Sequence, residues 1–329
     1  MIKDRSCVNC SSQNSEVMFT FTRDFFHNVR NQPLEQLDAL GIDDNFTSSI
    51  VKCIDCGCGY IKDVINIRET FLGQENWSSA QIKENLRTYQ NGFSKSGADN
   101  IIYAESVVKN LIRLVMMKNK NKSELSLLDF GCSFSVYSPL ARIMGFTKVD
   151  AFDPHFPDNS SELASGNSVV NFNFFNHKEQ ILENAPYDAI ICNSADEHFL
   201  DPQGEINFMS EVLSDDGVIY FSHPIMDLDS NLKHLQNESN ITNKKLIKEL
   251  RATFHVHHLN YIMPKIFKKM LKKGGLVESK VVILKKENLS ESAFHVKNLI
   301  LYTKTFIKYF LGLFGSNYRK TEYFLTKIK

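Results

Sequence analysis

The fold is decided by the stretch Leu125-Ser-Leu-Leu-Asp-Phe-Gly-Cys-Ser-Phe-Ser135. Its apolar residues lack the spacing of an amphipathic helix, and a turn that begins at Gly131 follows Asp129 and Phe130. Such a run is typical of a buried parallel strand whose carboxyl end faces a ligand. Gly131 lets the backbone approach that ligand closely, and the next helix offers it unpaired N–H groups. We therefore predict the first strand of a nucleotide-binding sheet.

A second acidic residue ends the next predicted strand. The run Lys148-Val-Asp-Ala-Phe-Asp-Pro-His155 places Asp153 24 residues after Asp129. A carboxylate at this position is suited to the two hydroxyl groups of a ribose. Together the two acids indicate a ligand that contains adenosine.

Further motifs follow in a recognisable order. They are Ala151-Phe-Asp-Pro154, Tyr187-Asp-Ala-Ile-Ile191, Glu197-His-Phe-Leu-Asp-Pro202, Glu211-Val-Leu213 and Gly217-Val-Ile219. With the opening stretch they resemble the class I S-adenosylmethionine-dependent methyltransferases over roughly residues 103–284. The resemblance implies a Rossmann-like, doubly wound, mainly parallel sheet and S-adenosylmethionine as cofactor. The sequence departs from the family at Ser133 and Ser135, where glycines are usual, and this bears on the loop conformation and on cofactor affinity.

The resemblance also implies where the cofactor would be bound. Tyr89 occupies the place of a tyrosine that reaches the methionine carboxylate, although a core contact explains it equally well. Asn173 follows a predicted strand and would lie on the adenine side. Since ligands of such sheets bind beyond the strand ends, we expect these cofactor residues: Tyr89, Asp129, Gly131, Cys132, Ser133, Asp153, Pro154, Asn173, Asn193 and Ser194.

Two Cys-x-x-Cys pairs precede the domain. Cys7 with Cys10, and Cys53 with Cys56, would present four thiolates to one tetrahedral ion, so we predict a structural Zn2+ in a small zinc-ribbon-like module. Cys58 is a fifth thiol that could replace a neighbour. A disulfide framework is the weaker interpretation because the sequence shows no secretory signal. In this superfamily such a module resembles the branch that modifies sugars and other small metabolites.

The chain divides into three predicted units. Residues 1–70 form the zinc-binding module, with a helix near 33–44. Residues 71–98 form a linker helix (77–89) and a lid. Residues 99–329 form the Rossmann-like domain with an insertion at 225–255 and an amphipathic helix near 294–314. Within it we expect helices at 101–117 and 262–270, strands at 149–152, 169–172, 189–192, 218–221 and 275–284, and an edge strand near 323–328.

Composition limits the function classes. The chain has 329 residues with 43% hydrophobic content and no apolar segment after its first residues, so we expect a cytoplasmic protein. Residues 225–329 hold 20 Lys and Arg against 8 Asp and Glu. This excess fits an anionic acceptor or peripheral membrane contact, and a solvated lysine face is the simpler explanation.

Nucleic-acid binding and a membrane-spanning helix are both disfavoured. Residues 1–70 lack the basic stripe of a nucleic-acid binder. Lysines interrupt 294–314, so this helix cannot span a bilayer, and packing on the domain is favoured over a membrane surface.

Three histidines are candidate bases. Methyl transfer is an in-line displacement, and a hydroxyl acceptor must also lose its proton. His198 follows the fourth strand, His223 follows the fifth, and His257 precedes a helix. The family pattern places His257 or His258 near the acceptor. A metal site at residues 255–258 is disfavoured because no spaced carboxylate or thiolate accompanies these histidines.

We therefore expect methyl transfer from S-adenosylmethionine to a small molecule, a sugar or an anionic sugar conjugate. A nicotinamide dehydrogenase is disfavoured because Gly-x-Gly-x-x-Gly is absent from the first turn. A non-catalytic binding protein on the same scaffold is the alternative, since Ser133 and Ser135 could weaken the cofactor loop. The methylated atom and the oligomeric state stay open.

Overall fold

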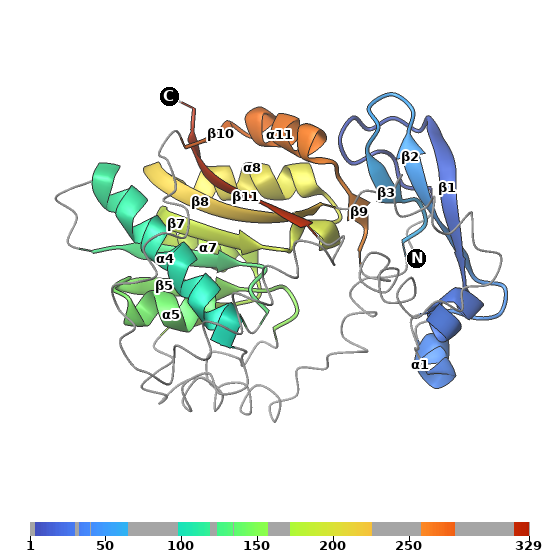
Figure 1. The fold of residues 1–329 in the computed structure, drawn as a ribbon, viewed down its shortest axis with the longest axis horizontal. Coiled ribbons are helices and arrows are strands. Elements are labelled where there is room, and N and C mark those ends of the chain that lie inside the picture. The colour runs from blue at the N-terminus through green and yellow to red at the C-terminus, as the bar shows by residue number, and fades with distance from the viewer. Residues whose placement is uncertain are drawn as a thin grey trace.

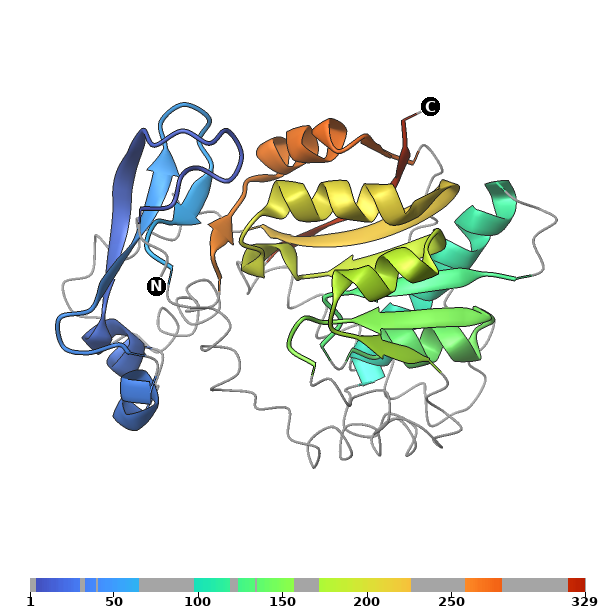
Figure 2. The same cartoon turned by 180° about the vertical axis from the view of Figure 1, so that it is seen from behind.

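The computed structural model describes residues 4–29, 33–39, 41–64, 98–118, 124–133, 135–156, 172–225, 258–279 and 319–328. Within these residues the chain forms a seven-stranded and a four-stranded sheet (Figures 1 and 2). The predicted linker helix and lid, nearly all of the insertion, and the predicted helix 294–314 lie outside the described residues.

The larger sheet has the order of a doubly wound fold. The five strands from β8 to β6 run parallel, and β11 and β10 join by antiparallel pairing beyond β8. The central strand β4 lies between β7 and β5, where the strand order reverses, and ligands bind at this point in such sheets. In spatial order the strands are β10 (Leu276–Glu278), β11 (Arg319–Lys327), β8 (Leu213–Ile225), β7 (Tyr187–Asn193), β4 (Ser126–Phe130), β5 (Lys148–Phe152) and β6 (Asn173–Phe175). The Rossmann-like prediction is confirmed.

Helices cover both faces of this sheet. One face carries α4 (Ala98–Lys118) and α5 (Tyr137–Ile143), and the other carries α7 (Lys178–Asn184), α8 (Pro202–Val212) and α11 (Pro264–Lys273) (Figures 1 and 2). The apolar side of α4 packs into the core, and α8 begins where the Asp201 carboxylate accepts a hydrogen bond from the Gly204 N–H group. None of the helices in the described residues is long and apolar enough to cross a membrane.

Two predicted elements differ from the structure. Of the strand predicted at 169–172, residues 169–171 lie outside the described residues, and Phe172 precedes β6, which begins at Asn173. The segment predicted to close the sheet edge is β11, but Leu276–Glu278 pairs with its far side and makes β10 the edge. Both errors arise because an apolar run does not fix where a strand begins or which strands flank it.

The smaller sheet is built mainly from the N-terminal module. It contains β1 (Ser15–Thr22), β2 (Thr47–Cys53) and β3 (Gly59–Ile61), accompanied by the π-helix η1 (Phe25–Val29) and by α1 (Leu34–Ala39). Its fourth strand is β9 (Asn260–Tyr261), which comes from the far end of the sequence and pairs with β3. The module predicted at 1–70 therefore lacks one strand of its own sheet.

The two sheets share one hydrophobic core. Cys7, Val51 and Tyr60 of the module lie in the same buried cluster as Phe130 of β4 and Phe267 of α11. Figure 1 shows β9 standing between the two sheets. Burial of apolar surface across this boundary couples the stability of the module to that of the larger domain.

This coupling predicts the result of a core truncation. Val51→Ala removes two methyl groups at a side chain with 0% exposure and should lower the free energy of unfolding by about 2 kcal/mol. Because the core is shared, urea unfolding should remain one transition that moves as a whole. Val17→Ala on β1, where the side chain is 64% exposed, is the control and should change stability by less than about 0.5 kcal/mol. Two separate transitions, with only the first affected by Val51→Ala, would contradict the shared core.

Candidate active site

The loop after β4 depends on glycine at one position. Gly131 has a φ of +68°, and a Cβ added there would lie 2.8 Å from the Cβ of Ala195, just past the end of β7. The N–H groups of Gly131 and Cys132 both donate to the carbonyl of Phe152, at 2.9 and 3.0 Å. The loop is thus fixed to the end of β5 and packed closely against the chain that leaves β7.

Asp129 lies beneath this loop, almost completely buried. Its Oδ2 atom accepts hydrogen bonds from the hydroxyl groups of Ser135 at 2.6 Å and Ser138 at 2.8 Å. Burial raises the pKa of Asp129 to about 6, although these two hydroxyl donors partly oppose the shift. The carboxylate therefore anchors the first turn of α5 and stays close to titration near neutral pH.

Asp153 lies at the end of β5 and connects with the same loop. Its Oδ2 accepts from the Ser133 N–H group and its Oδ1 from the His155 N–H group, each at 3.0 Å. Burial raises the pKa of this carboxyl group, and His155 opposes the rise. Ser133 takes part through its backbone in the left-handed region, with φ at +46°, whereas Ser135 takes part through its hydroxyl group.

The remaining predicted cofactor residues fall into different places. Cys132 is buried beside the loop, Pro154 is exposed in the turn after β5, Asn193 ends β7, and Ser194 follows it. The Asn193 side-chain oxygen accepts a 3.5 Å bond from the Tyr137 hydroxyl, a contact that the sequence did not indicate. Tyr89 lies outside the described residues.

The position of Asn173 differs from the predicted one. Asn173 is the first residue of β6, and it pairs with Asp150 in the middle of β5, away from the carboxyl edge. Its amide donates to the Asp150 carboxylate at 2.7 Å. Asn176, which follows β6 directly, lies next to the edge instead and donates to the carbonyl of Phe156 at 3.1 Å.

His198 stands just beyond the carboxyl end of β7. It closes the short 3-10 helix η2 (Asp196–His198), and its side chain is 30% exposed. The ring of His258, which precedes β9, lies 5.1 Å away between centroids. His257 lies outside the described residues. The structure therefore brings His198 and His258 together at the strand-end edge.

His223 has a positioning role instead of the predicted role as a base. Its Nδ1 atom lies 2.5 Å from the Asp196 carboxylate and its Nε2 atom 2.6 Å from the Ile262 carbonyl, so both nitrogens donate. Burial alone lowers the pKa of His223, but the Asp196 carboxylate and the carbonyl raise it above its usual value. With one ring nitrogen engaged by the Asp196 carboxylate and the other by the Ile262 carbonyl, neither nitrogen is available to a substrate.

Backbone contacts fix η2 against β9. The Leu259 N–H group donates to the Glu197 carbonyl at 2.6 Å, and the side-chain amide of Asn260 donates to the carbonyls of Asp196 and Phe199 at 2.9 and 2.7 Å. The module contributes Arg5, whose guanidinium donates to the carbonyls of Leu259, Phe199 and Leu200 and to the Asn260 side-chain oxygen. Arg5 thus holds the module onto the histidine-bearing edge, a role that no sequence motif indicated.

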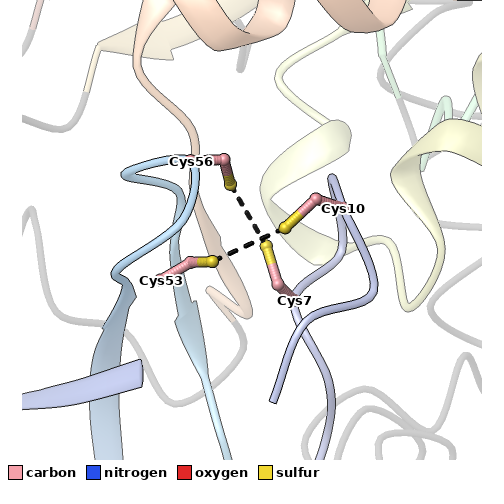
Figure 3. A group of neighbouring side chains, drawn as sticks. All are labelled: Cys7, Cys10, Cys53 and Cys56. Carbon is pink, nitrogen blue, oxygen red and sulfur yellow. Dashed lines mark hydrogen bonds between the residues drawn. The ribbon is translucent and has the colours of Figure 1, made fainter. Parts of the chain in front are cut away.

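The four predicted metal ligands converge (Figure 3). The Sγ atoms of Cys7 and Cys56 are 3.5 Å apart, as are those of Cys10 and Cys53. In a tetrahedral zinc site with Zn–S bonds of about 2.3 Å the sulfurs are about 3.8 Å apart, whereas a disulfide needs about 2.05 Å. Cys58 is outside this group, and its thiol points to the Gly59 carbonyl. The thiol set is compatible with a closed zinc site.

Comparison with known proteins identifies the larger domain. Residues 102–281, more than half of the chain, match a family described as a methyltransferase domain. No curated protein sequence matches the chain. The protein PKMT2 from Rickettsia typhi is a similar solved structure, at 13% identity and a TM-score of 0.36, and the match covers 62% of this chain and 49% of that one.

Two other solved structures are similar. The cyclopropane synthase MmaA2 from Mycobacterium tuberculosis has 17% identity and a TM-score of 0.36, with 51% of this chain and 60% of that chain covered. The plantazolicin methyltransferase BpumL, solved with a desmethylPZN analog and SAH, has 15% identity and a TM-score of 0.40, with 77% and 99% covered. The chain spans about half the length of the Rickettsia protein. As each score is below 0.5, the family assignment rests on the sequence match.

Gly131 allows a direct test of the loop. Gly131→Ala adds a Cβ that meets Ala195. The resulting overpacking should lower the free energy of unfolding by roughly 1–3 kcal/mol, in addition to the loss caused by the positive φ. Gly41→Ala is the matched control, with a φ of +70° and no atom within 4 Å of the added Cβ. Urea unfolding should rank Gly131→Ala below Gly41→Ala in stability, and calorimetry with S-adenosylhomocysteine should show weaker binding for Gly131→Ala alone. Equal losses of stability and unchanged affinity would contradict the close packing of this loop.

Proposed function

We propose, from the premise that this chain belongs to the methyltransferase-domain family and is an S-adenosylmethionine-dependent methyltransferase, that its acceptor is a small molecule, a sugar or sugar conjugate. The proposed location of the acceptor is supported by one observation, the close approach of the His198 and His258 rings beyond the end of β7. The Cys-x-x-Cys module, whose resemblance is to sugar-modifying relatives, supports the sugar class. A biosynthetic route to a polysaccharide or natural product would use such a step.

The cofactor would lie across the ends of β4 and β5. Asp129 and Asp153 stand at these neighbouring strand ends, and the Gly131 loop lies between them. An Asp153 carboxylate that turns to the ribose hydroxyls exchanges its bond from the Ser133 N–H group for bonds from the ligand. S-adenosylmethionine supplies the reactive methyl group, and the chain supplies its position.

His198 is the proposed base. Its position past β7, three residues after Ala195, which lies close to Gly131 of the cofactor loop, supports a place on the acceptor side. A hydroxyl acceptor loses its proton as the methyl group is transferred, and a neutral imidazole accepts one in the neutral pH range. Its partial exposure leaves a path for the proton to reach solvent.

An anionic acceptor fits the charge distribution. Residues 225–329 carry 12 more basic than acidic side chains, from 20 minus 8. Lys244, Lys245 and Arg251 are proposed to attract a diphosphate or carboxylate, and they lie outside the described residues. Attraction of this kind weakens as salt screens it.

A structural zinc is the second part of the proposal. Four thiolates would complete its coordination and leave no position for substrate, so the ion would act on folding and not on the reaction. The bound ion would hold the loop of Cys7 and Cys10 against the turn between β2 and β3. Arg5, two residues before Cys7, would thereby keep its place on the histidine edge.

Zinc analysis with two cysteine variants tests this part. Protein purified under reducing conditions should contain one zinc per chain by elemental analysis. Cys10→Ser removes a ligand and should lose zinc and melt at lower temperature, since metal binding contributes to folding. Cys58→Ala removes the neighbouring thiol that lies outside the ligand group and should retain zinc. Zinc-free wild-type protein, or loss of zinc in Cys58→Ala alone, would refute the assigned ligand set.

A labelling panel tests the acceptor class. The full chain is incubated with labelled S-adenosylmethionine and nucleotide sugars, free sugars, small phenols, peptides and nucleic acids. We expect label in the nucleotide sugars, less of it at high salt, and loss of most transfer in His198→Gln, by roughly 100-fold or more. Label in nucleic acid or peptide alone would overturn the acceptor class. Binding of S-adenosylhomocysteine without transfer to any acceptor would favour the non-catalytic scaffold.

A further inference from the structure

Three potential metal ligands meet at the histidine edge. Glu197, His198 and His258 each offer one nitrogen or oxygen atom, and these atoms all lie within 4.8 Å of one another. The Nε2 atom of His198 lies 4.0 Å from the Oε1 atom of Glu197. Glu197 and His198 come from η2, and His258 comes from a segment 60 residues later. Because of this separation, the sequence alone did not indicate that a carboxylate lies near His258.

The ligands stand on a braced framework. Glu197 and His258 are buried, at 3% and 9% exposure. The Leu259 N–H group, adjacent to His258, donates to the carbonyl of Glu197 itself, which fixes one ligand segment directly to the other. Beneath them the buried Asp196–His223 pair holds η2. Metal sites need such support behind the ligands, because it fixes their orientation before the ion arrives.

The donor set selects a class of ion. Two imidazoles and one carboxylate are typical ligands of divalent transition metals such as Zn2+, Mn2+, Fe2+ and Co2+. A divalent cation bound here would be stabilised by the carboxylate of Glu197, which lies within 4.8 Å of a nitrogen of each histidine. Three protein ligands leave at least one coordination position open, and the partly exposed His198 indicates the side from which another ligand can enter.

We propose that Glu197, His198 and His258 form a second metal site, which binds a divalent transition-metal ion with an open position toward the acceptor. It differs from the cysteine site in two ways. Its ligands are nitrogen and oxygen atoms instead of sulfur atoms, and its three protein ligands leave a coordination position for a further ligand. Its use in the reaction rests on the methyl transfer proposed above and changes one role in it: with the ion bound, His198 would be a ligand and no longer the base. An acceptor hydroxyl bound to the ion would have a lowered pKa and would lose its proton to solvent water on the exposed side of His198.

Cobalt binding tests the site without any measurement of activity. Full-length protein with zinc in the cysteine site is titrated with Co2+, followed by visible absorption and by metal analysis after gel filtration. We expect one Co2+ per chain, with the weak bands of nitrogen and oxygen ligation. His258→Gln and His198→Gln should each weaken Co2+ binding by at least about tenfold. His27→Gln in η1 is the control and should bind Co2+ as the wild type does.

The outcomes are separable from folding and from the proposed reaction. Thermal melts of each variant verify that the chain is folded, and the partly exposed His198 is the substitution least disruptive to packing. No Co2+ binding beyond the zinc, equal binding in His258→Gln and wild type, or only the intense bands of Co2+ bound by thiolates would each overturn the site. Methyl transfer that persists without Co2+ binding would leave the proposed function standing and remove this ion from it.

Discussion

The buried carboxylate of Asp129 is the constraint on which the candidate site depends. It is the penultimate residue of β4, and the hydroxyl groups of Ser135 and Ser138 stabilise it there while they fix the start of α5. An ionised carboxyl group at this depth is costly, which its raised pKa reflects. A cofactor carrying an ammonium group would offset that cost. Under the proposed function, cofactor binding would therefore stabilise a charge that burial destabilises.

The N-terminal module reaches the same edge from the other side. Its sheet takes in β9, its core is continuous with that of the larger domain, and Arg5 bonds to the segments that carry His198 and His258. Burial lowers the pKa of Arg5 to about 10, so the guanidinium remains charged at neutral pH. If the proposed zinc is bound, it would stabilise the module and, through Arg5, the segments that carry His198 and His258.

Local sequence patterns predicted the strands and the cysteine pairs, but they did not predict contacts between residues far apart in the chain. The apolar runs of β4, β5, β7 and β8 and the spacing of four cysteines each lie within short segments, so the sequence indicated them. The membership of β9 in the module's sheet, the pairing of His223 with Asp196 and the approach of His258 to Glu197 join segments 27 to about 200 residues apart. At Ser133 the residue type suggested a defect, whereas its backbone N–H group provides the contact.

The pH dependence of S-adenosylhomocysteine affinity tests the cofactor site most directly. Because the pKa of Asp129 in the free protein is about 6, the carboxyl group is neutral below that pH, and an ammonium-bearing ligand favours its ionised form. Calorimetry should show affinity rising by up to about tenfold per pH unit from 5 to 6 and levelling above 7. Asp129→Asn should bind more weakly, with no such rise. A flat wild-type profile, or the same profile in Asp129→Asn, would contradict the account.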